Sequence, residues 1–235
     1  MRKQLMFCVL SSVLICLLSL PAMAQQTLKL PPYKKVKLPN GLTLILMDQK
    51  EVPIVSFSVT VRAGAVIDPT AKEGLAATTA ELLRKGTKTR TADQIGSQLD
   101  FVGGILEFET NADRTQGVAE FLKKDITVGL DLLSDVLMNP TFPQAEVDKL
   151  IKQSIDTIKQ NKDSASQVIR NYYEAYLFAG HPYARPESGD EASLANIKRD
   201  DIVRFYEQQY GPQATTIVAV GDFDTAQMER ALTDK

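Results

Sequence analysis

The sequence is poor in the side chains that most catalytic and metal sites use. Among its 235 residues there are a single histidine, His181, two cysteines and no tryptophan. The cysteines, Cys8 and Cys16, both lie near the start, so the chain after residue 24 has no thiol for a disulfide, a nucleophile or a metal ligand. This scarcity excludes, within these residues, any site built from several imidazoles or thiolates.

Long apolar runs are also scarce, and the clearest one lies at the start of the chain. Two basic residues at positions 2–3 precede an apolar stretch over 5–20, and Ala22-Met23-Ala24 follows. This order predicts a secretory signal peptide over residues 1–24 that is cleaved after Ala24, leaving the mature protein in the periplasm. A retained anchor is the alternative, but the run is short for a membrane span of about 20 residues. Cys16 lacks the preceding small residue of a lipoprotein site, so we expect no membrane attachment after cleavage.

Neither sign of charge dominates the rest of the chain. Removing Arg2 and Lys3 with the signal peptide reduces the 27 basic residues to 25, against 29 acidic residues. This balance gives no electrostatic reason to expect nucleic acid or an anionic membrane as a partner. Residues 25–235 contain no repeat or long linker, which favours a single domain. A helix start near Asp224-Thr225, close to the last residue, predicts that this domain is the front part of a longer two-domain chain.

Alternating apolar residues predict several strands. Asn40-Gly41 separates two such runs, 33–38 and 42–46, which is typical of a hairpin. Apolar residues alternate with polar ones over 55–62, and this run is predicted to be a central antiparallel strand. The same reasoning predicts two strands around a turn at 111–113 and a buried strand over 216–220.

Between these runs the apolar spacing becomes helical. Leu75, Thr79 and Leu82 recur at helical intervals, and Gly86 is the expected stop. The predicted helices cover 73–85, 91–102, 126–137, 147–158, 168–177 and 201–210. Together the patterns predict an α+β fold, with a mainly antiparallel sheet that is covered on one face by helices.

Several short segments follow one another along the chain in a recognisable order. They are Leu38-Pro39-Asn40-Gly41-Leu42, Val61-Arg62-Ala63-Gly64-Ala65, Gly74-Leu75-Ala76 with Lys85-Gly86-Thr87, Gly180-His181-Pro182-Tyr183, Phe205-Tyr206 with Tyr210-Gly211-Pro212, and Val218-Ala219-Val220-Gly221-Asp222-Phe223. In this order the chain resembles the insulinase/pitrilysin zinc peptidases and their mitochondrial processing relatives. The resemblance covers nearly all of the chain after residue 24.

The chain departs from that family at the residues that carry its chemistry. Active members have H-x-x-E-H between the two framing segments, where two histidines bind one zinc and the glutamate activates its water. The five matching positions here read Ala77-Thr78-Thr79-Ala80-Glu81, and Glu81 is the one metal-capable side chain among them. The family's third ligand aligns with Thr157, or with Asp156 one residue earlier. The resemblance therefore implies no catalytic residue here, and a zinc ion only in a partner.

The remaining candidates for catalysis do not form a known arrangement. His181 lies in a Gly-His-Pro loop far from the motif, and its ordinary interpretation is a loop side chain satisfied by hydrogen bonds. Serines such as Ser97, Ser134 and Ser193 lack the G-x-S-x-G sequence that surrounds many nucleophilic serines. The chain also has only a single histidine that could act as their base. An active zinc metalloendopeptidase with an unconventional site is accordingly the least favoured interpretation.

The resemblance still implies a role in handling peptides. Family members pair similar domains around a chamber, so we expect a non-catalytic partner of a zinc-bearing insulinase/pitrilysin-type subunit that acts on peptide substrates. Such peptides add a strand to a sheet edge near the metal helix. The matching residues are Leu106, Glu107, Phe108, Glu109 and Thr110.

Two alternatives remain open for this segment and for the whole chain. Glu107 stands where active relatives commonly have asparagine, and the segment is also consistent with an ordinary strand that Glu107 and Glu109 keep soluble. The chain as a whole is also consistent with a stand-alone periplasmic module that binds peptides or proteins without a catalytic partner.

Overall fold

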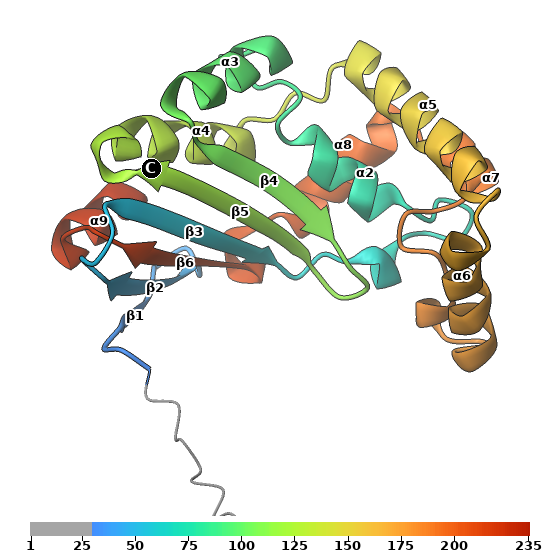
Figure 1. Cartoon of the computed structure of the whole chain (residues 1–235), viewed down its shortest axis with the longest axis horizontal. Coiled ribbons are helices and arrows are strands. Elements are labelled where there is room, and N and C mark those ends of the chain that lie inside the picture. Colours follow the sequence, from blue (N-terminus) through green and yellow to red (C-terminus); the bar gives the residue numbers. More distant parts are fainter. Residues whose placement is uncertain (1–29) are drawn as a thin grey trace, which may run out of the picture. The chain divides into compact units, whose positions relative to one another are not determined.

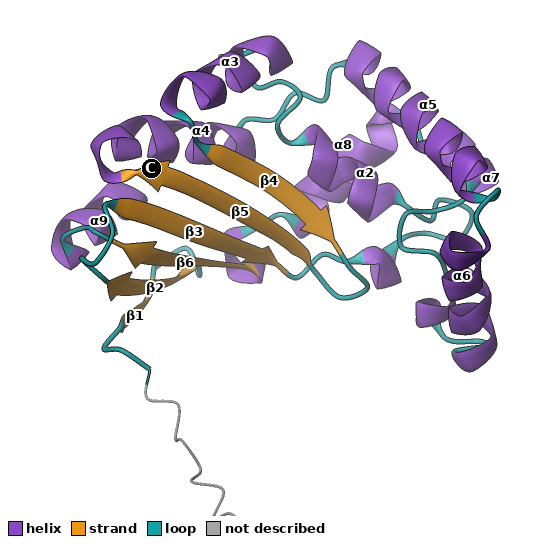
Figure 2. Cartoon of the chain, viewed as in Figure 1, coloured by secondary structure: helices purple, strands orange, loops and turns teal. Residues whose placement is uncertain are grey.

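The fold is built on one six-stranded sheet with helices on one side of it (Figures 1 and 2). The structure, a computed structural model, describes residues 30–235, except for the side chains of residues 167, 170 and 171. The predicted signal peptide and both cysteines lie outside the described residues. The strands are β1 (Lys34–Lys37), β2 (Thr43–Asp48), β3 (Ile54–Val61), β4 (Ile105–Thr110), β5 (Thr115–Leu122) and β6 (Thr215–Gly221).

Except for the short helix α7, which was not predicted, the helices occupy nearly the positions that the sequence predicts. They are α2 (Leu75–Leu82), α3 (Ala92–Val102), α4 (Ile126–Met138), α5 (Gln144–Asn161), α6 (Ala165–Leu177), α7 (Glu191–Asn196), α8 (Arg199–Gln209) and α9 (Thr225–Thr233). Among residues 30–235, no helix is both long enough and apolar enough to span a membrane.

The strand order is β1-β2-β6-β3-β5-β4. β3 pairs antiparallel with β5 and with β6, which confirms the predicted central strand. β1 and β2 form the predicted antiparallel hairpin around Asn40-Gly41. β6 enters between β2 and β3 and pairs parallel with β2, so the sheet is mixed but mostly antiparallel.

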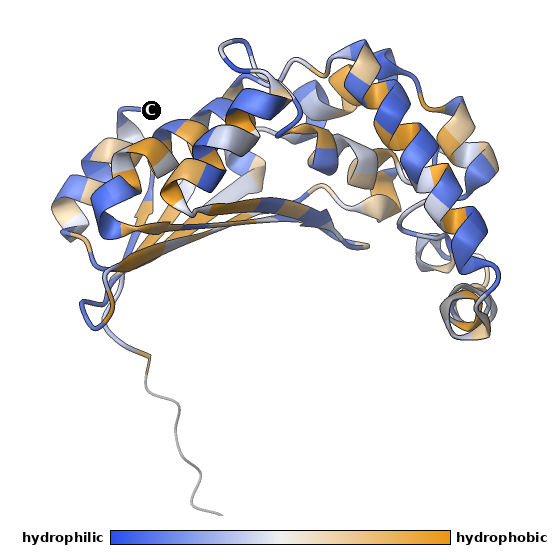
Figure 3. Cartoon of the chain, turned by 45° about the horizontal axis from the view of Figure 1, so that its top comes forward, coloured by the Kyte–Doolittle hydropathy of each residue, from blue (hydrophilic) through white to orange (hydrophobic). Residues whose placement is uncertain are grey.

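The core lies between the sheet and the helices. Side chains alternate along each strand, and one set is buried, as Val55, Phe57, Val59 and Val61 on β3 illustrate. The helices pack on this face, and Figure 3 shows them on one side of the sheet. Gly129 on α4 is required there, because an added Cβ would lie 2.4 Å from the ring of Phe121 on β5. The predicted α+β fold, with one face of the sheet covered, is therefore confirmed.

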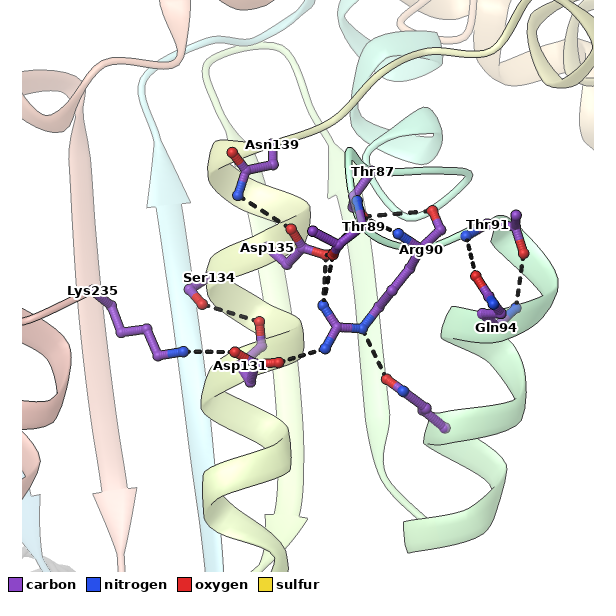
Figure 4. A network of polar contacts seen from close by, with 11 residues as sticks. Thr87, Thr89, Arg90, Thr91, Gln94, Asp131, Ser134, Asp135, Asn139 and Lys235 are labelled. Atoms are coloured by element: carbon purple, nitrogen blue, oxygen red, sulfur yellow. Dashed lines mark hydrogen bonds and ion pairs between the residues drawn. The ribbon is translucent and has the colours of Figure 1, made fainter.

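A buried polar network fixes the turn between α2 and α3 to α4 (Figure 4). Asp135 is 6% exposed and accepts hydrogen bonds from Thr87 (2.6 Å), Thr89 (2.7 Å), Arg90 (2.7 Å) and Asn139 (3.1 Å). Burial alone would raise the pKa of this carboxyl, but the four hydrogen bonds outweigh it and lower the pKa to about 2. The carboxylate thus ties α4 to the connection that leads out of α2.

We predict that this network weakens in acid. Because the pKa of Asp135 is lower in the folded state, its contribution is complete above the ordinary value of 3.8 and is lost as pH falls towards 2. Asp135→Asn should lower the free energy of unfolding by about 2 kcal/mol at pH 7 and by much less near pH 2, measured by urea denaturation. Asp131→Asn, at a more exposed partner of Arg90, should cost less at pH 7. A difference between wild type and Asp135→Asn that stays constant with pH would contradict this account.

Candidate functional site

The degenerate motif positions lie on α2, which packs against the edge strand β4 and against α5 (Figure 1). The fold therefore brings together the three elements that the resemblance implicates. Ala77 and Glu81 are one helical turn apart, with Ala77 half-buried and Glu81 exposed. Ala80, at the position of the catalytic glutamate, is completely buried. That position contributes a methyl group to the core and offers no group to a water molecule.

The third ligand position lies on α5 and is equally unsuited to a metal. Thr157 is exposed, and the carboxylate of the neighbouring Asp156 accepts a hydrogen bond from Lys152 at 2.8 Å. This hydrogen bond with Lys152 lowers the pKa of Asp156. Within residues 30–235, no group of three or more histidine, cysteine, aspartate or glutamate side chains is placed to hold a metal ion. The residues at the family's zinc position do not fit a catalytic zinc, which needs about three protein ligands and a water.

His181 is found where the sequence places it, in a loop. Its Nδ1 accepts a hydrogen bond from the backbone N–H of Tyr183 at 3.2 Å, and the two rings meet edge to face with centroids 4.7 Å apart. Tyr183 in turn donates its hydroxyl to Asp113 at 2.7 Å. The histidine therefore caps a turn that contacts the β4–β5 loop, as its ordinary interpretation holds.

The start of α2 depends on a residue that sequence reasoning missed. Gly74 occupies the position before the helix with φ 91°, and it has no side chain to cap the free N–H groups. Asp68 supplies the missing acceptor, taking hydrogen bonds from the N–H groups of Gly74 (2.8 Å) and Ala76 (2.9 Å). Because Asp68 precedes Gly74 by six residues, it does not match the spacing of an ordinary cap.

Asp68 is itself enclosed by the loop that follows α6. Asp68 is 4% exposed, and burial raises the pKa of its carboxyl to about 6, although the backbone hydrogen bonds and nearby Arg185 act in the opposite direction. Arg185 donates to the carbonyl oxygens of Asp68 and Val66, each at 2.9 Å. Glycine is needed at position 189, because a Cβ there would lie 2.2 Å from the carbonyl oxygen of Glu73. The start of the motif helix is thus held by Asp68 and by the loop that follows α6.

The predicted peptide-binding segment forms β4, one of the two edge strands of the sheet. Leu106 and Phe108 point into the core, whereas Glu107 and Glu109 are exposed and Thr110 is half-buried. Asn111 donates its N–H to Arg114 at 3.0 Å, which closes the hairpin to β5. Because hydrogen-bonded pairs alternate in an antiparallel ladder, residues 106, 108 and 110 direct their N–H and C=O groups towards the free edge. This edge offers three residues' backbone groups to an added strand.

Comparison with known proteins assigns the fold to a family. Residues 44–191 match the family model described as Insulinase (Peptidase family M16), and the chain belongs to this family. A protein named as an uncharacterized zinc protease of Rickettsia bellii is 24% identical over 188 residues, 80% of this chain and 46% of that protein. A similarly named protein of Mycobacterium leprae is 28% identical over 194 residues, 83% of this chain and 44% of its own length.

Solved structures show the same fold. The peptidase M16 inactive domain from Pseudomonas fluorescens superposes with a TM-score of 0.82 at 20% sequence identity, covering 86% of this chain and 50% of that one. This chain spans about half the length of the curated relatives that it matches. The family and the fold are therefore established, and the activity of a whole protein is a separate question.

We predict that Asp68 makes stability depend on pH in the opposite sense to Asp135. Because the pKa of Asp68 is higher in the folded state, its contribution is complete below about pH 4 and is lost as pH rises through about 6. In Asp68→Asn this loss is absent. The free energy of unfolding of this variant, relative to wild type, should therefore rise by roughly 3 kcal/mol from pH 4 to pH 7 in urea titrations.

A second variant separates charge from capping. Asp68→Ala also lacks the titrating group, but it loses both backbone hydrogen bonds and should be about 1–2 kcal/mol less stable than Asp68→Asn at every pH. If both variants follow the wild-type dependence on pH, Asp68 does not titrate as described.

Proposed function

We propose that this chain is a non-catalytic domain of the insulinase family that acts with a zinc-bearing relative in the proteolysis of peptides. The observation that carries this proposal is the replacement of the motif side chains on α2. The predicted signal peptide supports a periplasmic location, with cleavage after Ala24.

Hydrolysis of a peptide bond at neutral pH needs a water molecule that has been made nucleophilic. In this family a zinc ion held by imidazoles does so, and a glutamate accepts the water's proton. At the matching positions α2 presents two alanines and one exposed carboxylate, and Thr157 on α5 adds an uncharged hydroxyl. A carboxylate alone is a weak base near neutral pH, and the described residues around it do not provide the set of ligands that would hold a metal ion to acidify water.

Similarity to other proteins supports such a role in a limited way. The Pseudomonas fluorescens structure is described as an inactive domain of this family. The relatives named as zinc proteases are about twice as long as this chain. Both the inactive domain and the greater length of these relatives are consistent with a pair of domains, of which one has a metal site and the other does not.

The edge of β4 supports a role in holding peptide. A peptide in extended conformation could pair with the backbone groups of residues 106, 108 and 110, which would give affinity without demanding a particular sequence. The exposed carboxylates of Glu107 and Glu109 lie on the same strand and would favour basic peptides. The zinc site that cuts this peptide would belong to the partner.

A stand-alone peptide-binding module is the second candidate. The same free edge favours it, because strand addition at β4 requires neither a metal nor a second subunit. The two candidates differ in whether binding by this chain changes the activity of a zinc peptidase.

We predict that the purified chain does not hydrolyse fluorescein-labelled casein peptides, and that it raises their hydrolysis by a co-purified zinc-bearing relative. The increase should saturate at a fixed molar ratio, because it reflects assembly of a complex. Binding of the peptides without any effect on the peptidase would favour the stand-alone module. Chelator-sensitive hydrolysis by this chain alone, abolished in Glu81→Ala, would refute both candidates.

We further predict that Thr110→Pro weakens peptide binding about five-fold or more, as measured by fluorescence anisotropy. Proline removes a backbone N–H that faces the free edge and that β5 does not use, so one hydrogen bond to the peptide is lost. Thr110→Val is the matched control, because it removes the hydroxyl that contacts Thr115 but keeps the N–H. Equal affinities for the two variants would show that peptide does not bind at this edge.

A further inference from the structure

Helix α6 has an apolar face that the described residues do not cover. Ile169, Tyr172 and Tyr176 follow one another at intervals of three and four residues, so they lie on one side of the helix, with Tyr173 beside them. Ile169 is 64% exposed, Tyr172 70%, Tyr173 60% and Tyr176 87%. We call these four side chains the tyrosine face. Large apolar side chains that are exposed together mark a surface on which another molecule binds.

The rest of the described structure gives α6 little support. None of the described side chains of α6 is buried. Phe178, which follows the last residue of the helix, packs against Tyr183, and the two rings meet edge to face with centroids 5.6 Å apart. A helix of 13 residues is only marginally stable in water by itself, because most helices gain their stability from an apolar face that is buried. A partner that buries the tyrosine face would therefore stabilise α6.

α6 lies at the end of the edge that is proposed to bind peptide. Glu174 and Phe178 border a small cavity together with Ala112, which belongs to the loop between β4 and β5. Tyr183, in the loop after α6, donates its hydroxyl to Asp113 of the same β4–β5 loop at 2.7 Å. Figure 1 shows α6 at this end of the domain, beyond the turn between β4 and β5. A protein that reaches over the edge of β4 therefore comes next to α6.

The tyrosine face has the composition and the size of part of a protein interface. Tyrosine is enriched in interfaces, because its ring buries a large apolar area while its hydroxyl can still form a hydrogen bond. The three tyrosines expose roughly 400 Å², and each protein contributes about 800 Å² to an interface of standard size. A peptide paired along β4 brings only its end to α6, which is too little to cover this area. The size of the tyrosine face therefore favours a folded protein.

We propose that the tyrosine face of α6 is a surface on which the zinc-bearing relative docks. The proposal rests on the proposed function, in which the zinc site of that relative acts on a peptide held at β4. A relative in that position comes next to α6 and can bury the tyrosine face. A second copy of this chain has no zinc site, and the proposed function does not place it at β4.

Affinity measurements with the zinc-bearing relative test this docking surface. The relative is the insulinase-family protein of the same organism that has the H-x-x-E-H motif, purified separately, and its affinity for this chain is measured by biolayer interferometry. Tyr172→Gln and Tyr176→Gln should each weaken binding about five-fold or more, and the double variant about 30-fold or more, because each substitution removes an aromatic side chain that the complex buries. Glutamine is at least as good a helix former as tyrosine, so α6 itself should be preserved.

Tyr33→Gln is the matched control for the single variants. Tyr33 is also exposed, but it lies beside β1, at the opposite edge of the sheet from β4, so its substitution should leave the affinity for the relative unchanged. In the absence of the relative, the double variant should bind fluorescein-labelled casein peptides with the affinity of wild type. It should also unfold at the same urea concentration, because both side chains are exposed in the chain by itself.

Failure of this docking surface can be distinguished from failure of the proposed function. If the double variant binds the relative as tightly as wild type does, the docking surface lies elsewhere and the proposed function is unaffected. If wild type does not bind the relative, or if the organism encodes none, both proposals fail. Weaker peptide binding by the double variant alone would show that α6 contacts the peptide instead. Self-association of wild type that the double variant loses would show that a second copy covers α6, and either result would overturn the proposal.

Discussion

A water molecule attacks a peptide bond at neutral pH when a metal ion lowers its pKa and a base takes its proton. In this family both requirements are met by side chains on two helices, and the function proposed for this chain follows from the residues that stand in their place. α2 presents Ala77 and Ala80 where an imidazole and a carboxylate are needed, and Glu81 where a second imidazole is needed. Thr157 on α5 adds no charge.

The motif helix keeps its place although nothing in it binds a metal. Ala80 is buried in the core, and the hydroxyl of Thr79 is satisfied by the carbonyl oxygen of Leu75 at 2.8 Å. At its start, the carboxylate of Asp68 accepts hydrogen bonds from the free N–H groups of the helix. Arg185, in the loop after α6, donates a hydrogen bond to the carbonyl oxygen of Asp68. At the other end, the network around Asp135 fixes the connection to α3. These contacts preserve the surroundings of β4, which is the part of the site that a peptide-holding domain requires.

Most of the fold could be predicted because its signals are local. Asn40-Gly41 indicates the hairpin, the alternation over 55–62 indicates the central strand, and the predicted helix over 91–102 begins at a capping box formed by Thr91 and Gln94. The order of the strands could not be predicted in the same way. β6 lies between β2 and β3 through contacts between residues that are more than 150 positions apart, and no short pattern records such a pairing. The six-residue helix α7 was missed because it is too short to show a period.

For the candidate site too, local features could be predicted and long-range contacts could not. The missing ligands could be read directly, since one histidine in the whole sequence cannot supply an H-x-x-E-H motif. The role of Asp68 could not be predicted, because it caps a helix that begins six residues later and because its partner Arg185 lies more than a hundred residues further along the chain.

The central claim, that this domain cannot form a catalytic zinc site, is tested most directly by titrating zinc into the metal-free, tag-free chain in a calorimeter. The account predicts only weak binding without a defined stoichiometry, because the residues at the motif provide a single carboxylate. One tight site per chain that is lost in Glu81→Ala would contradict it.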